Sequence, residues 1–499
     1  MRSFLFILLL ATFACCHLPS PSNRNIETNT LQDRATNAIR NWQNLDLQTD
    51  GVFGISTNKA YAQLLKNKTA KTIIVAVIDS GVDTTREELK TVLWTDPNDG
   101  SHGRNYIGAE TGKEDFIPML AITPGTSSYS RILDDYNLHV TRLQTFMTKL
   151  EESKKILEQI VKNLGQDNPS FENIKSYHPR NEGETMLINL LLDRMPFYTD
   201  FKSLRFNEVD HLLELGKYHL EHALNKTITS KADTISVNNK PEGIDANVSS
   251  DPLGLIEVPN VSPFHGTHMA GIIAAVRKND NGIDGICDHV RIMMLKLNNN
   301  IREMRNDNLA AAIRFAVDHG ARVISMSFGK TFSWHRGLVD ESVRFAMSRN
   351  VLIVHSSGND GMNLDVAGNS FFPSARYFDG GIASAWITVG ASGYHNDSTL
   401  AEPFSNYGQN NVDVFAPGVQ ITSTIPHSGY AAWDGTSEAT PIVAGLAALI
   451  MEYYPTLTSV QVKEIIIKSA AKTVWLRDKC VSGGVVNAYY ALKLAEEYK

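Results

Sequence analysis

The sequence predicts an α/β fold in which a mostly parallel sheet is flanked by helices on both faces and interrupted by a helical insertion. Apolar segments rich in β-branched residues alternate with segments of helical pattern, which favours strand-helix-strand units. The apolar segments are continuous runs, as in residues 72–78, and such runs are typical of strands buried on both faces. Residues 128–226 instead show helical periodicity and are expected to form the insertion.

The predicted elements follow one another in a regular order. Residues 72–78 form the first strand, which ends at Asp79, and the small residues 266–276 form a helix directly after His265. Ser437 precedes a second apolar helix, and proline is tolerated in the first turn of such a helix. Further strands are expected at residues 290–296, 322–328, 351–355, 386–390 and 412–415. Further helices are expected at residues 307–319, 337–349, 437–454, 459–470 and 487–497.

Three short segments carry a carboxylate, an imidazole and a hydroxyl in the chain order Asp, His, Ser. Their sequences are Val77-Ile-Asp-Ser-Gly-Val-Asp83, His265-Gly-Thr-His-Met-Ala-Gly271 and Gly435-Thr-Ser-Glu-Ala-Thr-Pro441. A serine hydroxyl is a weak nucleophile until a base removes its proton, and a neutral imidazole can be that base near pH 7. A carboxylate holds the imidazole in the required tautomer. The pattern therefore predicts Asp79, His265 and Ser437 as a catalytic triad.

Each of these residues, taken alone, would more often be a turn or helix-capping residue. Their joint order, at strand carboxyl ends and helix amino ends, is what favours catalysis. Two neighbouring residues could be mistaken for triad members. His268 lies three residues into the predicted helix and is expected to be structural, and Asp83 is expected to be a loop or capping residue.

The three segments resemble the motifs of the subtilisin-like serine proteases, the subtilases. The resemblance covers most of residues 46–96 and 250–499. Within Ser356-Ser-Gly-Asn-Asp-Gly361, Asn359 aligns with the oxyanion-hole asparagine of that family. The resemblance implies that the Asn359 amide and the Ser437 backbone N–H stabilise the developing oxyanion.

A further segment resembles the strand with which subtilases pair to an extended peptide substrate. It covers residues 324–329, Ile-Ser-Met-Ser-Phe-Gly. The implied substrate-binding residues are Ser327, Phe328, Gly329, Ser357 and Gly358. These segments carry no charge before Asp360, so we expect the first pocket to prefer neutral or apolar side chains.

The segment around the nucleophile departs from the family pattern at two positions. Glu438 stands where methionine is common, and Ile442 stands where histidine often follows the proline. Neither change removes a triad member. The simpler interpretation of Glu438 is that the helix macrodipole favours a carboxylate in the first turn. The alternative is that Glu438 borders the leaving-group side of the site and favours basic residues there.

About 185 positions separate Asp79 from His265, whereas subtilases usually place these residues a few tens of positions apart. We expect residues 97–249 to be a mainly helical insertion into a peptidase domain formed by residues 45–96 and 250–499. Apolar residues at three- and four-residue spacing predict a long amphipathic helix. They are Leu133, Tyr136, Val140, Leu143, Met147, Leu150, Leu157, Val161 and Leu164. Residues 186–192 and 209–224 predict more helix. The insertion is interpreted either as a decorating bundle or as a substrate-selecting cap.

The amino-terminal residues have the pattern of an export signal. A basic start is followed by an apolar run at residues 4–10 that is too short to span a bilayer, so residues 1–16 are predicted to be a signal peptide. Ala14 followed by Cys15 resembles the cleavage site of a bacterial lipoprotein, which predicts lipidation of Cys15, export to the cell envelope and a membrane anchor. The alternative is an ordinary signal peptide that removes both neighbouring cysteines. Residues 17–44 would be a tether, too short for a pro-domain with its own core.

Composition excludes few functions, but it limits the kinds of partner that are expected. The chain has 499 residues, 42% of them hydrophobic, and a net charge of −7, which gives no indication of nucleic-acid binding. Cys287 and Cys480 are expected to be buried thiols, although export would permit a disulfide. No metal-binding pattern appears, and no cofactor is expected to be required. The family resemblance implies that calcium can bind, with no ligand set matched. The oligomeric state stays open.

The sequence therefore predicts a serine endopeptidase that acts on protein or peptide substrates. Two alternatives remain. One is a catalytically silent homologue that binds peptides without cutting them, and the other is an esterase on the same site. The intact set of Asp79, His265, Ser437 and Asn359 argues against the first. Relative turnover of peptides and esters would distinguish the second.

Overall fold

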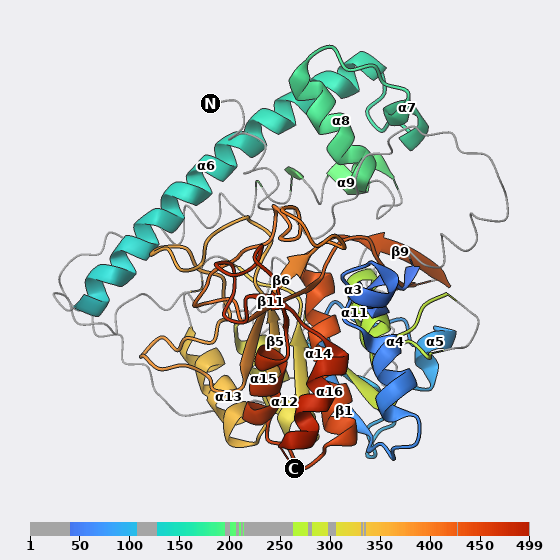
Figure 1. Ribbon diagram of the computed structural model, residues 1–499. Helices are drawn as coiled ribbons and strands as arrows, with labels where there is room; N and C mark the ends of the chain where they lie inside the picture. Colours follow the sequence, from blue (N-terminus) through green and yellow to red (C-terminus); the bar gives the residue numbers. More distant parts are fainter. Residues whose placement is uncertain are drawn as a thin grey trace. The chain divides into compact units, whose positions relative to one another are not determined.

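The protein contains two compact units (Figure 1). The computed structural model describes residues 40–106, 127–194, 200–205, 209–210, 213, 263–277, 282–297, 306–330, 333, 336–426 and 428–498. One unit contains a large sheet and the helices that cover it. The other, within residues 110–244, contains the described helices of the predicted insertion.

The sheet has nine strands among the described residues, in the order β10-β11-β7-β6-β5-β4-β1-β3-β2 (Figure 1). The pairs from β11 to β2 are parallel, and β10 pairs antiparallel with β11. The strands are β1 (Ile73–Asp79), β2 (Gly103–Asn105), β3 (Val290–Lys296), β4 (Val323–Met326), β5 (Leu352–Ser356), β6 (Trp386–Ser392), β7 (Val414–Pro417), β10 (Ala471–Lys472) and β11 (Gly484–Val485). The predicted fold class, a mostly parallel α/β sheet, is confirmed.

Strand β1 lies at the point where the strand order reverses. Its residue Val77 pairs with Met294 of β3 on one side and with Ser325 of β4 on the other. The chain therefore adds β3 at one side of β1 and then returns to add β4 at the opposite side. In open α/β sheets, ligand crevices lie beyond the carboxyl ends of the strands at such a reversal.

Helices cover both faces of the sheet. Alternate residues of β1 point to opposite faces, so Val75 and Val77 belong to one hydrophobic core while Ala76 and Ile78 belong to the other. Side chains of α11 (Phe264–Ala274) and α14 (Thr436–Tyr453) fill the first core. Side chains of α12 (Asn306–Asp318) and α13 (Arg336–Ser348) fill the second. Burial on both faces is what continuous apolar strands favour.

The remaining helices of this unit lie before β1, between β1 and β2, and after α14. They are η1 (Trp42–Asn44), α3 (Leu47–Asp50), α4 (Thr57–Ala60), η2 (Tyr61–Leu65), α5 (Glu87–Lys90), α15 (Ser459–Lys468) and α16 (Ala488–Glu497). The predicted strands and helices of the sheet unit begin and end within a few residues of those observed.

Helix α14 runs through the core and is buried over residues 436–452. Near its carboxyl end it buries Glu452, whose carboxyl group lies close to the Cys287 thiol and the His289 backbone N–H. Burial, with the charge of Asp288 added, raises the pKa of Glu452 to about 8. A second carboxyl group, Glu438, is buried near the opposite end of the same helix.

A hairpin that the sequence did not predict packs on α11. It consists of β8 (Ile421–Ile425) and β9 (Gly429–Trp433). The Ser423 hydroxyl donates to the carbonyl of His268 at 2.7 Å, and the Thr424 hydroxyl donates to that of Thr267 at 2.9 Å. Gly271 permits this approach, because a Cβ there would lie 2.2 Å from Thr424 Oγ1.

The helical unit contains α6 (Ser127–Leu164), α7 (Phe171–Lys175), α8 (Glu182–Arg194) and α9 (Phe201–Arg205). The carboxyl half of the predicted stripe is buried, at Met147, Leu150, Leu157 and Val161. Side chains of the stripe before Thr141 lie outside the described residues, as does that of Leu143. The polar break at Lys154 is an ion pair, with Nζ 2.6 Å from Oδ1 of Asp210.

Several sequence predictions have outcomes at the level of the fold. Cys287 and Cys480 are buried free thiols, as predicted. Strand β2, which we had assigned to the insertion, belongs to the sheet through its pairing with β3. The signal segment, Cys15 and most of the helix predicted at residues 209–224 lie outside the described residues. Within the described part of the chain, none of the helices has the length and apolar character needed to cross a membrane.

Candidate active site

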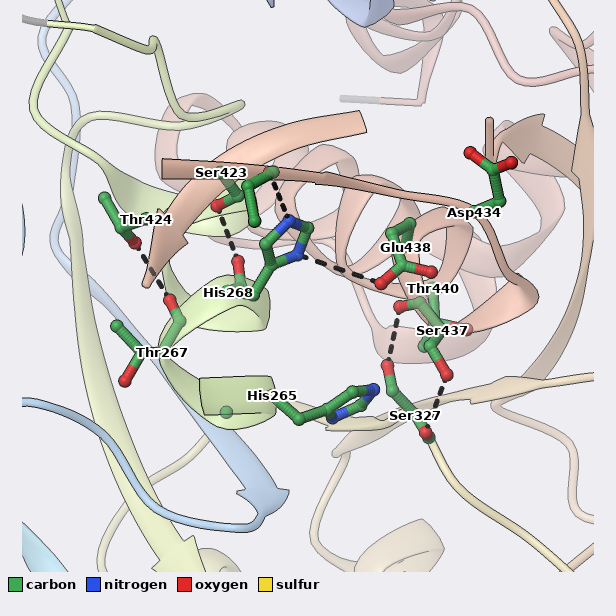
Figure 2. A network of polar contacts seen from close by, with 12 residues as sticks. His265, Thr267, His268, Ser327, Ser423, Thr424, Asp434, Ser437, Glu438 and Thr440 are labelled. Carbon is green, nitrogen blue, oxygen red and sulfur yellow. Dashed lines mark hydrogen bonds and ion pairs between the residues drawn. The ribbon is translucent and has the colours of Figure 1, made fainter. Parts of the chain in front are cut away.

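Three element ends carry the predicted triad. Asp79 is the last residue of β1, His265 lies in the first turn of α11, and Ser437 is the second residue of α14. All three side chains are buried, with 4%, 8% and 3% of their residue surfaces exposed. The His265 ring points to the side on which Ser327 and Ser437 lie (Figure 2).

The Asp79 carboxylate contacts one ring nitrogen of His265. Its oxygens lie 2.8 and 2.9 Å from Nδ1 of the imidazole, which therefore donates its N–H to the carboxylate. The lone pair is left on Nε2, which has no hydrogen-bond partner among the described residues. Burial opposes a positive charge on this ring, but the Asp79 carboxylate, with a smaller effect of Glu438, outweighs it and raises the pKa of His265. The pair is thus arranged to accept a proton at Nε2 and to stabilise the resulting imidazolium.

Two hydrogen bonds, one from the side chain of Ser437 and one to its backbone, link this residue to Ser327 after β4. Its hydroxyl donates to the Ser327 carbonyl at 3.0 Å, and the Ser327 hydroxyl donates to the Ser437 carbonyl at 2.9 Å (Figure 2). These two bonds therefore hold Ser437 against the predicted substrate-binding segment at Ser327. Contacts between a serine and its base are often long before substrate binds, and rotation about one bond would redirect this hydroxyl.

Thr436, the residue before Ser437, orients the side chain of Asn359. Its Oδ1 accepts hydrogen bonds from the Thr436 backbone N–H at 2.9 Å and the Thr436 hydroxyl at 2.8 Å. A Cβ on Gly435 would lie 3.4 Å from Nδ2 of Asn359 and 3.5 Å from the backbone nitrogen of Ser437. The Asn359 side-chain nitrogen and the Ser437 backbone nitrogen therefore lie near the same point, where Gly435 lacks a side chain.

Comparison with known proteins identifies the family of this chain. The model of the subtilase family matches residues 70–489. This chain belongs to the subtilase family. It is 36% identical over 207 residues to alkaline elastase YaB of Bacillus sp. (strain YaB), covering 41% of this chain and 50% of that protein. It is 36% identical over 229 residues to thermitase of Thermoactinomyces vulgaris, covering 46% of this chain and 75% of that protein.

A solved protease from Pseudoalteromonas arctica is 27% identical, with 46% of this chain and 70% of that chain covered and a TM-score of 0.40. The subtilase described here spans about half the length of several relatives that it matches: 50% of alkaline elastase YaB, and 55% each of an alkaline protease of Alkalihalobacillus alcalophilus and of M-protease of Shouchella clausii (strain KSM-K16).

Glu438 is a buried acid directly after Ser437 in the sequence of this subtilase. Its oxygens accept no hydrogen bond from another described residue, and Oε1 lies 3.8 Å from Nδ1 of His268 (Figure 2). Burial raises the pKa of Glu438 to about 8, although the proximity of His265 opposes the shift. The expectation that the helix macrodipole favours a carboxylate here does not hold, because the cost of burying the charge is larger than the dipole effect.

His268 packs beside Glu438 and Trp433, and its ring contacts these residues rather than Ser437. Its Nε2 lies 3.0 Å from the Ala431 carbonyl and therefore bears the proton, which leaves Nδ1 as an acceptor toward Glu438. The ring stacks on Trp433 with centroids 4.2 Å apart. Burial lowers the pKa of His268 to about 3, so the ring is neutral. A protonated Glu438 fits this environment, since it could donate to Nδ1.

Asp83, the other residue not expected to belong to the triad, accepts a hydrogen bond from the Thr85 backbone N–H in a loop.

The predicted substrate-binding residues lie after two adjacent strands. Ser327, Phe328 and Gly329 follow β4, while Ser357 and Gly358 follow β5. The Ser357 hydroxyl donates to the Asn406 carbonyl at 2.9 Å. Beneath them, the buried His355 lies with Nε2 2.7 Å from the Phe328 carbonyl. No local signal marks His355 in the sequence, because its position in a continuous strand resembles that of any core residue.

No calcium ligand set can be assigned to the described residues. Within this part of the chain, no three or more His, Cys, Asp or Glu side chains are grouped as they would be around a metal ion. Calcium binding therefore stays a prediction from the family resemblance.

Proposed function

We propose that this subtilase is a serine endopeptidase in which Asp79, His265 and Ser437 form the catalytic triad. The observation that carries the proposal is the contact of both Asp79 oxygens with His265 Nδ1, at 2.8 and 2.9 Å. It fixes the tautomer that leaves Nε2 unprotonated. A peptide-binding protein without catalysis would have no use for a buried carboxylate that holds an imidazole in this form.

The proposed reaction begins with transfer of the Ser437 hydroxyl proton to His265 Nε2 as the oxygen attacks the peptide carbonyl. The carbonyl oxygen becomes an oxyanion that accepts hydrogen bonds from Asn359 Nδ2 and the Ser437 backbone N–H. His265 then gives its proton to the leaving amine, and the C–N bond breaks to leave an acyl-enzyme. Water, deprotonated by His265, releases the carboxylic acid and returns the proton to Ser437.

Labelling with a serine-directed fluorophosphonate tests the assignment directly. Wild-type protein should be labelled and should cut peptide substrates, while Ser437→Ala should do neither at an unchanged melting temperature. Labelling that persists in Ser437→Ala would move the nucleophile elsewhere. Ester turnover without peptide turnover would identify an esterase instead, and wild-type protein that binds peptides but is not labelled would be the silent homologue.

We also propose export and lipid anchoring at Cys15, which the signal-like pattern of residues 1–16 supports. More than one acyl chain is needed for stable anchoring, and the acylated cysteine of a lipoprotein would supply it. Mass spectrometry of the mature amino terminus should find a lipid-modified cysteine, and Cys15→Ser should release the protein from membranes. A mature chain that starts after Cys16 and carries no lipid would contradict this proposal.

The helical insertion is proposed to be separable from catalysis. The buried stripe of α6 is matched by buried residues of α8, at Leu187, Ile188 and Leu191, inside one compact unit. Replacing residues 128–226 by a short Gly/Ser linker should therefore leave a folded protein that a fluorophosphonate labels, because loop closure depends weakly on length. Faster cleavage of large proteins would indicate a cap, and loss of one protein substrate would indicate docking. An unlabelled product would contradict separability.

A further inference from the structure

The space beside the nucleophile is bounded by two loops that follow neighbouring strands. Strands β4 and β5 pair in parallel, Met326 opposite His355, so the segments after them emerge side by side. One segment contacts Ser437 through the Ser327 carbonyl, and the other contacts Thr436 through Asn359 Oδ1. A peptide paired with residues 327–329 and attacked by Ser437 would direct a side chain into the gap between these loops.

The ring of Phe371 lies in this gap and contacts the backbone of both loops. A Cβ on Gly329 would lie 2.2 Å from Cε1 and 2.4 Å from Cζ of Phe371. A Cβ on Gly358 would lie 2.8 Å from Cδ2 and from Cε2 of the same ring. Because real Cβ atoms do not approach other atoms this closely, the ring fills the volume that side chains at residues 329 and 358 would need. Both loops therefore carry glycine where the ring touches them.

Neighbouring contacts hold the Phe371 ring in position. Phe372 is buried in the second core and exchanges two backbone hydrogen bonds with Lys330, at 2.7 and 2.9 Å, directly after Gly329. The buried His355 ring lies 5.7 Å from the Phe371 ring, centroid to centroid. Gly358 has a φ of +97°, in the left-handed region where a side chain would be strained. The ring is thus held from three sides and only partly exposed on the fourth.

We propose that Phe371 fills the pocket for the residue whose carbonyl Ser437 attacks, and that this subtilase cuts after small, uncharged side chains. The inference rests on the proposed peptidase function and deepens it. The pocket wall formed by Ser327, Gly329 and Gly358 offers no charge, so a charged side chain would lose its hydration without a partner. A side chain larger than that of alanine or serine would meet the Phe371 ring.

The test compares tetrapeptide p-nitroanilides that differ only in the residue before the scissile bond, with alanine, leucine or phenylalanine there. Enzyme concentrations are set by fluorophosphonate titration of competent sites. Wild-type enzyme should have the highest kcat/KM for alanine. In Phe371→Ala, the phenylalanine-to-alanine ratio of kcat/KM should rise by about 100-fold, within the range that added methylenes confer on a pocket. Phe371→Leu should give a smaller rise.

Phe378→Ala is the matched control. It removes the same side chain from the same stretch of chain, at a position that is 41% exposed. Its ratio should stay equal to that of the wild type. Wild-type enzyme that is labelled and cuts after phenylalanine as fast as after alanine would overturn the Phe371 inference while leaving the proposed function intact. Equal ratios in wild type and Phe371→Leu would do the same. Absence of labelling and cleavage in the wild type would overturn both.

Discussion

The two ends of helix α14 bury the same chemical group in different surroundings. Glu438 lies one residue after Ser437 at the amino end, and Glu452 lies beside Asp288 at the carboxyl end. Both are fully buried, and burial raises the pKa of each to about 8. A helix dipole alone would favour the charge at the first end and oppose it at the second.

The similar pKa values indicate that burial has a larger effect on both acids than the helix ends do. The difference between them lies in their neighbours. Oε2 of Glu438 and Nδ2 of Asn359 both border the spot where Gly435 lacks a side chain, with a Cβ there 2.6 Å from the first and 3.4 Å from the second. A charge on Glu438 would therefore repel the developing oxyanion, whereas a charge on Glu452 would affect only the stability of the fold.

The largest difference between the two helix ends is expected from the triad. Ser437→Ala and His265→Ala should each lower kcat by several orders of magnitude, as loss of a triad member does, while Glu452→Gln should leave kcat unchanged near pH 7. Because the two triad residues act together, the double variant should be no slower than the worse single variant. Steady-state kinetics on titrated enzyme measures this. A double variant that loses the product of the two single effects would contradict the assignment.

The next effect concerns the oxyanion donor at the amino end. Asn359→Ala should lower kcat by about a hundred- to thousandfold, the size seen when such a donor is removed from a member of this family. KM should change little, because the amide acts on charge that develops in the transition state. Asn359→Asp serves as a partner variant and should be slower still, since it places a second negative charge near the oxyanion. Unchanged kcat in Asn359→Ala would assign the oxyanion contact to other groups.

A smaller effect separates the two buried acids by pH. Among the described residues, the titratable groups that face Glu438 are His265 and His268 from α11, Asp79 from β1, and Asp434 after β9. Its carboxyl group is neutral below a pH of about 8 and ionises above it. Wild-type kcat should therefore fall as pH rises through about 8, and Glu438→Gln, whose amide can still donate to His268, should not show this fall. Glu452→Gln should retain it. The same alkaline fall in all three proteins would exclude Glu438 as its origin.

The smallest effect is on stability and should appear with Glu452. Its pKa is about 8 in the folded protein and 4.5 for an ordinary glutamate, so the folded state holds a proton that the unfolded state releases between these values. The free energy of unfolding should therefore fall as pH rises from about 4.5 to about 8, by something on the order of 1–4 kcal/mol. Denaturant unfolding of Glu452→Gln should show a shallower fall. Parallel curves for the two proteins would mean that Glu452 titrates normally.

Much of the sheet unit could be predicted because its signals are local. The strands β1, β3, β4, β5, β6 and β7 are apolar runs, and Asp79, His265 and Ser437 stand at element ends that the runs themselves define. Strand β2 pairs with β3 although it lies within residues 97–249, and Gly103–Asn105 has no apolar pattern that marks it as a strand. Its pairing depends on close backbone approach, since a Cβ on Gly103 would lie 1.6 Å from the Met294 carbonyl oxygen.

The details around the triad were beyond sequence reasoning for a related reason. The pairing of Glu438 with His268 joins residues 170 positions apart, and the contact of Phe371 with Gly329 and Gly358 depends on how two loops approach. Neither Phe371 nor His355 differs from an ordinary core residue in its local pattern. Their contacts near Ser437 form only when segments that are distant in the sequence pack together.

The position of β1 in the chain has a consequence for synthesis. Its neighbours in the sheet, β3 and β4, begin at Val290 and Val323, so the ribosome must add about 210 further residues before β1 can pair. At about 5–20 residues per second, this takes roughly 10–40 seconds. During that interval the apolar run of Ile73–Asp79 has both edges unpaired, which makes it a target for chaperones or for association with other nascent chains. The helical unit, whose contacts are local in sequence, can fold in the meantime.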